Sequence, residues 1–132
     1  MINSRDIADL RPDVQAKARA FLSKCAEEGI DVLITSTYRD HASQDALYAQ
    51  GRTIQGKKVT NAKAGQSFHN YRVAFDFCPI LNGKCQWADV ELFTMCGEIG
   101  ESVGLEWAGR WTRFKELAHL QQPGLSIADL KA

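Results

Sequence analysis

An alternating run that leads into an Asn-Gly pair constrains the fold of this chain more than any other feature. Over residues 72–78, every second side chain is large and apolar, namely Val73, Phe75 and Phe77. This period-two pattern is typical of a strand with one buried face. Asn82-Gly83 follows, and this dipeptide strongly favours a tight hairpin turn. The sequence therefore predicts a β-hairpin with its partner strand at residues 84–87.

Helical patterns precede this hairpin. Pro12 suits the first turn of a helix, where its missing N–H leaves no hydrogen bond unmade. Apolar residues then recur at helical spacing until Gly29, a typical helix stop. Residues 30–35 are a short β-branched run that predicts a strand. Asp40 is a favourable N-cap, so we expect a second helix that ends near Gly51.

The remaining segments complete a mixed pattern. Residues 52–66 are polar and rich in Gly and Lys, which predicts a surface loop or lid. A third helix is expected over residues 89–103, although two internal glycines weaken that prediction. Residues 105–111 predict a strand with a loop, and residues 123–132 a short helix or tail. Helices mixed with hairpin-linked strands favour an α+β fold with a small antiparallel sheet flanked by helices.

Length and charge limit the classes of function. The 132 residues suffice for one domain, which we assign to residues 1–132, and 45% hydrophobic residues allow a core. Sixteen basic residues balance sixteen acidic ones, whereas nucleic-acid binders usually carry a basic excess. No apolar run approaches the length of a bilayer span. The N-terminal sequence lacks the apolar stretch of a signal peptide, so we expect a soluble protein made in the cytosol.

Four cysteines are spread along the chain: Cys25, Cys78, Cys85 and Cys96. None forms a Cys-x-x-Cys pair, so a cysteine zinc ribbon is unsupported. In a cytosolic protein we expect reduced thiols that pack as small hydrophobic groups. Cys78 and Cys85 flank the predicted turn, which leaves open a disulfide after release into an oxidising space.

Two histidines have neighbours that suit metal chemistry. His69 is followed seven residues later by Asp76. Glu116 precedes His119 by three residues, so both side chains would share one face if that stretch were helical. Two imidazoles and a carboxylate form a catalytic zinc shell with one position open for water, whose pKa zinc lowers to about 7. On spacing alone this pattern is weak evidence for a zinc site. The third histidine, His41, we interpret as an exposed residue in the first turn of a helix.

Longer stretches resemble a known family. Residues 67–76, Ser-Phe-His-Asn-Tyr-Arg-Val-Ala-Phe-Asp, are similar to the Ser-x-His-x-x-Gly-x-Ala-x-Asp signature of zinc peptidases that act on peptidoglycan stem peptides. That family includes vancomycin-resistance D-Ala-D-Ala dipeptidases, D,D-carboxypeptidases and phage L-alanyl-D-glutamate endopeptidases. Residues 116–119 match its Glu-x-x-His signature. Residues 36–53 and 107–111 resemble its Arg/Gln block and its Trp-flanked stretch, and the resemblance covers residues 13–121.

The resemblance implies a hedgehog/D,D-peptidase-like zinc domain with a role for each matching residue. The implied ligands of Zn²⁺ are His69, Asp76 and His119. Glu116 is implied as the general base. Arg39 would stabilise the oxyanion or hold the scissile carbonyl, which is a large electrostatic contribution in such reactions. Substrate contacts are implied for Gln44 and Ser67.

Several positions depart from the family pattern. Arg72 stands at the usual Gly position and would be strained if the backbone there required a positive φ. Many endopeptidase relatives carry Asp where this chain has Glu116. The other departures are Ala108, Arg110, Ala118 and Leu120. These changes bear on substrate detail more than on the zinc ligands.

The resemblance implies hydrolysis of a peptide bond in the peptidoglycan stem, and we favour an L-alanyl-D-glutamate endopeptidase. A short chain without an export signal suits a phage endolysin for host lysis, made in the cytoplasm of the bacterial host and acting on the cell wall after release. We expect a monomer without nucleic-acid partner or membrane insertion. The alternatives are a D-Ala-D-Ala carboxypeptidase or dipeptidase, an inactive zinc-containing wall-binding module, which Arg72 keeps open, and a metal-free protein with a chance match.

Overall fold

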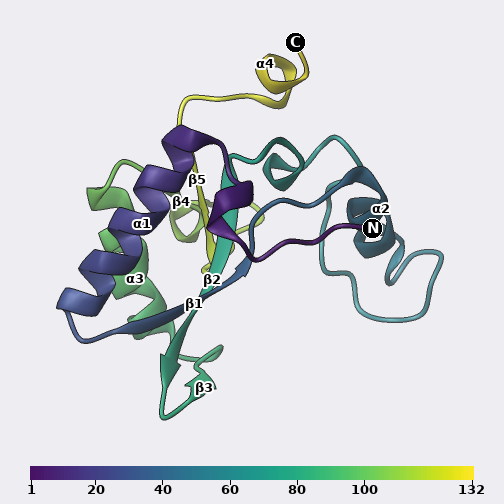
Figure 1. Ribbon diagram of the computed structural model, residues 1–132. Coiled ribbons are helices and arrows are strands. Elements are labelled where there is room, and N and C mark those ends of the chain that lie inside the picture. Colours follow the sequence, from purple (N-terminus) through teal and green to yellow (C-terminus); the bar gives the residue numbers. More distant parts are fainter.

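A five-stranded antiparallel sheet forms the centre of the computed structural model, which describes residues 1–132 (Figure 1). Three strands hold most of the pairing: β1 (Asp31–Ser36), β2 (Ala74–Leu81) and β5 (His119–Gln121). Two strands are short: β3 (Lys84–Cys85) and β4 (Glu106–Trp107). The strand order is β1-β2-β5-β4, and β3 pairs with the far end of β2. The α+β prediction with a small antiparallel sheet is therefore confirmed.

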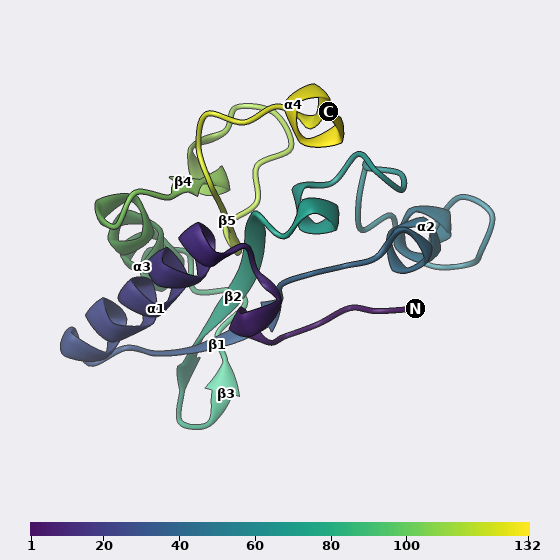
Figure 2. The same cartoon turned by 45° about the horizontal axis from the view of Figure 1, so that its top comes forward.

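Helices flank the sheet. The α-helices are α1 (Pro12–Glu27), α2 (His41–Ala49), α3 (Val90–Ser102) and α4 (Ile127–Lys131). Three short 3₁₀ helices are η1 (Ile7–Asp9), η2 (Phe68–Tyr71) and η3 (Ala108–Arg110). Figures 1 and 2 show α1 and α3 together on one side of the sheet, with α2 and its following loop on the other. None of the helices is both long and apolar enough to cross a bilayer.

The predicted hairpin forms with small shifts in its bounds. Asn82 and Gly83 have φ of +54° and +75°, the left-handed conformations that a tight hairpin turn requires. The strand β2 begins at Ala74 rather than Arg72, because Arg72 is the left-handed cap that ends η2. The partner strand is also shorter than predicted. All four cysteines are free thiols. Cys85 is the cross-strand partner of Ile80, and burial together with a hydrogen bond with Cys85 raises the pKa of the Cys78 thiol.

The core lies between the sheet and the α1–α3 pair. Phe21 of α1 packs against Phe75 and Phe77 of β2, with ring centroids 5.8 and 5.2 Å apart. Phe77 also packs on Phe93 of α3, 5.5 Å away. These aromatic side chains are almost fully buried. The inward-facing side of the predicted strand therefore anchors both helices and fixes the position of β2.

Close packing against the sheet explains why α3 contains Gly97 and Gly100, the two glycines that weakened its prediction. A Cβ at Gly97 would lie 2.2 Å from the ring of Trp107, and a Cβ at Gly100 would lie 2.6 Å from Leu120. The Trp107 ring is fixed because its Nε1 donates a 2.8 Å hydrogen bond to the carbonyl of Leu117. Glycine therefore allows α3 to approach β4 and β5 closely.

We expect Gly97→Ala to lower the free energy of unfolding. Overpacking in a core typically costs about 1–3 kcal/mol, which outweighs the gain of about 1 kcal/mol in helix propensity. Urea denaturation measures the difference. Glu98→Ala, at an exposed position of the same helix, is the control and should change stability by no more than about 0.5 kcal/mol. A Gly97→Ala protein as stable as the parent chain would contradict the close packing.

Candidate metal centre

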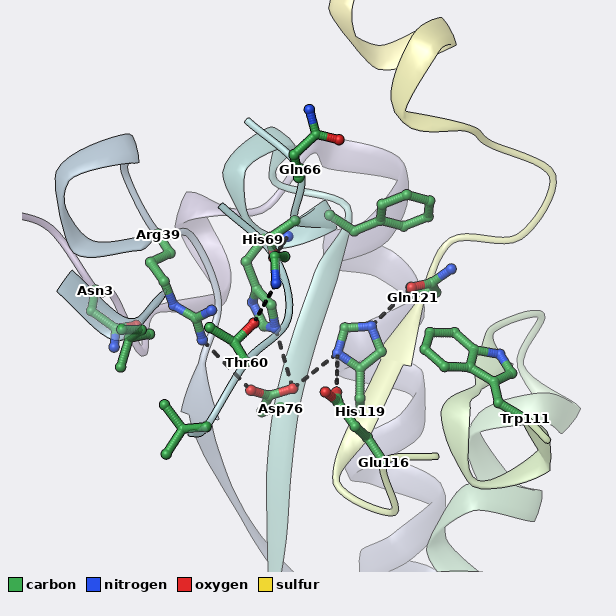
Figure 3. Close-up of a pocket in the computed structure, with 15 residues that line it drawn as sticks. Asn3, Arg39, Thr60, Gln66, His69, Asp76, Trp111, Glu116, His119 and Gln121 are labelled. Carbon is green, nitrogen blue, oxygen red and sulfur yellow. Dashed lines mark hydrogen bonds and ion pairs between the residues drawn. The ribbon is translucent and has the colours of Figure 1, made fainter. Parts of the chain in front are cut away.

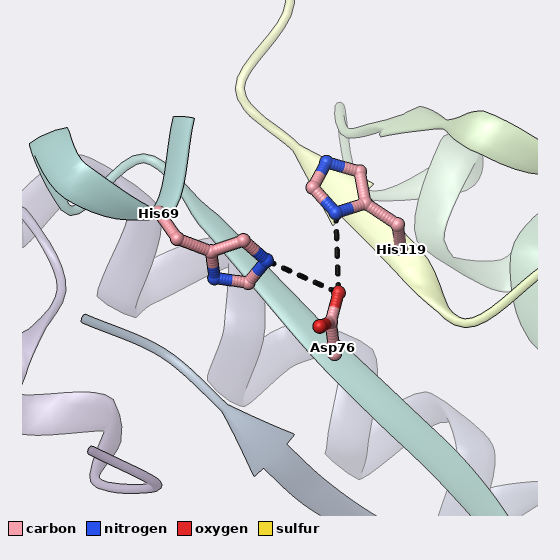
Figure 4. Close-up of side chains that lie close together, drawn as sticks. All are labelled: His69, Asp76 and His119. Carbon is pink, nitrogen blue, oxygen red and sulfur yellow. Dashed lines mark hydrogen bonds and ion pairs between the residues drawn. The ribbon is translucent and has the colours of Figure 1, made fainter. Parts of the chain in front are cut away.

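Three elements bring the predicted ligands together. Asp76 of β2 and His119 of β5 are direct cross-strand partners in the antiparallel register. His69 lies on η2, whose first turn is capped by Ser67. One donor atom from each of the three side chains lies within 4.8 Å of the others (Figure 4). The ligand group predicted from His69, Asp76 and His119 is therefore assembled by the fold.

Hydrogen bonds fix which nitrogen of each imidazole faces the centre. His69 Nδ1 lies 2.9 Å from the carbonyl oxygen of Thr37, so this nitrogen carries the hydrogen. His119 Nε2 lies 2.8 Å from Gln121 Oε1 and donates to it. The other two nitrogens, His69 Nε2 and His119 Nδ1, face Asp76 Oδ1 at 3.2 and 3.1 Å. A neutral imidazole has only one N–H, so both central nitrogens present lone pairs.

This convergence of lone pairs fits a metal ion. Two imidazole nitrogens and a carboxylate oxygen repel one another unless a cation lies between them. The same donor set with one further open position is that of catalytic zinc sites. The outer hydrogen bonds to Thr37 and Gln121 are the kind that orient ligating histidines. The residues present therefore fit Zn²⁺, as the sequence predicts.

The ligands also shift each other's protonation. When protons rather than a metal occupy the two central nitrogens, burial alone would raise the pKa of Asp76, but the charge of His69 and hydrogen bonds from both imidazolium rings hold that pKa well below its usual range. Burial alone would lower the pKa of His119, but the hydrogen bond and charge of Asp76, with the charge of Glu116, raise it. Asp76 therefore stays ionised at neutral pH, and protons compete with metal for His119.

Glu116 reaches the centre from a turn. Its Oε2 lies 3.6 Å from His119 Nδ1, and its side chain is about half exposed. The helix considered for residues 116–119 is wrong: residues 117 and 118 form a turn, and His119 begins β5. The chain reverses here because β5 must pair with both β2 and β4. The three-residue spacing still places the carboxylate beside the metal ligands.

Arg39 stands on the opposite side of Asp76. Its Nη2 lies 3.8 Å from Asp76 Oδ2, and the side chain is nearly buried. Nη1 donates a 2.8 Å hydrogen bond to Gln44 Oε1, and Nη2 donates to Ser36 Oγ at 3.2 Å. Arg39 Nε is buried without a hydrogen-bond partner. The guanidinium is therefore held rigidly, with its Nε buried and unpaired.

The two predicted substrate contacts have different positions. Gln44 has no exposed surface. Besides accepting from Arg39, it donates a 2.8 Å hydrogen bond to the carbonyl of Ala62, so it supports Arg39 and the 52–66 loop from behind. Ser67 lines the cavity, but its Oγ accepts from the backbone N–H of His69 at 3.2 Å. The structure thus gives Gln44 a supporting position rather than a place against substrate.

A cavity of about 600 Å³ opens over the metal centre (Figure 3). Arg39, Glu116 and the three metal ligands line it. Trp111 and Gln121 also line it, and neither was among the predicted site residues. The Trp111 ring lies 5.7 Å from that of His119. Gln121 follows His119 by two residues, so the period of a strand was the signal that both side chains share one face.

Comparison with known proteins identifies the family. The model of the VanY family, described as D-alanyl-D-alanine carboxypeptidase, matches residues 7–117. The chain belongs to the VanY family. One relative of this VanY-family chain is the peptidoglycan L-alanyl-D-glutamate endopeptidase CwlK from Bacillus subtilis (strain 168). It is 40% identical over 129 residues, which cover 86% of this chain and 74% of that protein.

Solved structures agree with this VanY-family fold. The Serratia marcescens L-Ala D-Glu endopeptidase ChiX superposes with a TM-score of 0.71 at 18% identity, over 99% of this chain and 93% of that one. A vancomycin-resistance D,D-pentapeptidase VanY in complex with Zn(II) has a TM-score of 0.66 at 14% identity, over 93% of this chain and 84% of that one. The expected zinc D,D-peptidase-like fold is therefore confirmed.

Arg72 is where this VanY-family chain departs most visibly from the signature. Its backbone has φ +65° and ψ +26°, so the position does require the left-handed conformation that glycine adopts easily. The guanidinium lies 3.9 Å from the ring centroid of Tyr38 and donates a 2.9 Å hydrogen bond to the carbonyl of Asp9. These contacts hold Arg72 outside the residues that line the cavity. The departure therefore bears on local stability and leaves the metal centre intact.

Proposed function

We propose that this chain is a zinc-dependent peptidase that hydrolyses the L-alanyl-D-glutamate bond of peptidoglycan stem peptides. The observation that carries the proposal is the convergence of three lone pairs, from His69, Asp76 and His119, beside the carboxylate of Glu116 in one cavity. The 40% identity to an L-alanyl-D-glutamate endopeptidase supports the choice of bond.

His69, Asp76 and His119 would hold the ion. Bound there, zinc supplies a Lewis acid that polarises the scissile carbonyl and lowers the pKa of water. Glu116 takes the proton of the attacking water and delivers it to the leaving amine. Its side chain is half exposed and adjacent to the ligands, so it reaches both the solvent and the reacting bond.

Arg39 supplies a fixed positive charge. Ser36 and Gln44 hold its guanidinium, so little reorganisation is needed when negative charge develops on the carbonyl oxygen. The guanidinium lines the cavity with a small exposed part of its side chain, which can face that oxygen or a neighbouring substrate group. Gln44 is then a positioning residue for Arg39, and Ser67 positions His69 through the cap of η2.

The biological setting is a further part of the proposal. By analogy with phage endopeptidases, we propose an endolysin that is made in the cytoplasm of the bacterial host and reaches the cell wall after release. It would act as a monomer, without membrane insertion. Expression with and without a separate membrane-permeabilising protein tests this setting, because lysis should require that protein.

Digestion of purified peptidoglycan identifies the bond. We expect new N-terminal D-glutamate, with L-alanine left on the muramyl side, as read by mass spectrometry of the products. The family description favours a second candidate, a D-alanyl-D-alanine carboxypeptidase, which would release D-alanine and create no glutamate amine. An inactive wall-binding module would retain peptide without producing either terminus.

A further inference from the structure

A second hollow continues the catalytic cavity past the metal ligands. It measures about 370 Å³ and shares Val59, Asp76 and Glu116 with the main cavity. Its other lining residues are Trp87, Phe93, Leu117 and Ala118. Trp87 follows β3, which pairs with the far end of β2. A substrate that crosses the metal centre therefore meets apolar side chains on this side together with the carboxylates of Asp76 and Glu116.

Trp87 presents an aromatic face at this hollow. Its ring stacks on that of Phe93, with centroids 6.1 Å apart and an interplanar angle of 27°. Phe93 is only 2% exposed and belongs to the core, whereas Trp87 is 59% exposed. One face of the indole is therefore supported by the core while the rest meets solvent. A large exposed aromatic ring beside a ligand cavity is typical of a binding surface.

Charge distinguishes the two sides of the metal centre. The main cavity is lined by the cation Arg39, and an adjoining hollow is lined by Lys63. The hollow at Trp87 contains no basic residue. In a peptidoglycan stem, the D-glutamate side of the bond carries the carboxylates. On the other side, L-alanine is joined by an amide to the lactyl group of muramic acid, which is left uncharged.

We propose that Trp87, supported by Phe93, forms a saccharide subsite that stacks on the N-acetylmuramic acid of the substrate. The charged peptide lies on the Arg39 side, so the uncharged muramyl group lies against Trp87. L-Alanine and the lactyl group occupy the hollow between them, beside Leu117 and Ala118. This inference rests on the proposed L-alanyl-D-glutamate specificity, because only cleavage next to the muramyl group brings the sugar this close to the metal centre.

A matched pair of substrates tests the subsite. One is N-acetylmuramyl-L-Ala-D-γ-Glu-L-Lys, and the other is the same peptide with an N-acetyl group in place of the muramyl group. The parent enzyme should prefer the muramyl substrate in kcat/KM, and Trp87→Ala should lower that preference by about tenfold, the scale of a good aromatic contact. Trp87→Phe should restore most of it. Val90→Ala, exposed but outside the hollow, should leave both rates unchanged.

Binding provides a readout that does not depend on cleavage. Calorimetry with zinc-loaded Glu116→Gln protein should show tighter binding of the muramyl compound than of the N-acetyl peptide, and adding Trp87→Ala should remove the difference. Equal losses for both compounds would overturn the saccharide subsite, and so would an unchanged preference. Absence of cleavage by the parent enzyme, with the binding difference retained, would refute only the proposed hydrolysis. Absence of the binding difference, with cleavage retained, would refute only the subsite.

Discussion

His119→Ala should remove the metal and abolish hydrolysis. The substitution leaves two of three protein ligands, and it removes the one that is paired directly across the sheet from Asp76. We expect one zinc per chain in the parent protein and almost none in the variant, measured by elemental analysis. His69→Ala should behave in the same way because its Nε2 faces the same carboxylate oxygen.

The loss of metal should also appear as a loss of stability. A ligand that binds only the folded state stabilises it, by about 4 kcal/mol when its free concentration is a thousand times its Kd. The parent protein should therefore melt at a higher temperature with zinc than with a chelator, and His119→Ala should show no such shift. His41→Ala is the control, since His41 is exposed at the start of α2. Full hydrolysis by metal-stripped parent protein would refute the zinc mechanism.

Glu116→Gln should separate catalysis from metal binding. The amide keeps the shape of the side chain but cannot accept the proton of water. General-base catalysis contributes about 10²–10⁴-fold, so turnover should fall by that order while zinc content stays at one per chain. The side chain is half exposed, so stability should change by no more than about 0.5 kcal/mol. Zinc content and turnover are measured on the same preparation.

If Glu116 had a different role, the Glu116→Gln substitution would give a different result. A direct zinc ligand would lose metal together with activity when it is replaced. A solvated surface charge would leave both unchanged, as we expect for the control Glu91→Gln at an exposed position of α3. Only retained zinc with lost turnover agrees with a general base.

Local signals in the sequence were sufficient for the hairpin, whereas the metal ligands were identified by the resemblance of longer stretches to a known family. The alternation that ends at Asn82-Gly83 depends on neighbouring residues, and the turn dihedrals agree with it. The signatures around His69 and His119 likewise predicted which residues meet. Neither pattern required knowledge of the tertiary fold.

The rest of the site depends on contacts between distant segments. Thr37 accepts the hydrogen bond of His69 across 32 residues of sequence, a pairing that no local pattern indicates. The motif placed Gln44 near Arg39 but gave no sign that it is buried behind the guanidinium. The three-residue spacing of Glu116 and His119 was compatible with a helix. In the structure, His119 instead pairs with β2 as part of β5, and a turn precedes it.

The direct pairing of Asp76 with His119 has a consequence for folding. The strand β5 is only three residues long, so its alignment with β2 is weakly specified by backbone pairing alone. A slip of one residue would turn His119 to the opposite face of the sheet and separate it from Asp76 and His69. Zinc therefore binds only the native alignment. The buried side chain of Leu120 already favours this register, and metal binding stabilises it further, so the ion that serves hydrolysis also reinforces correct folding of the C-terminal third of the chain.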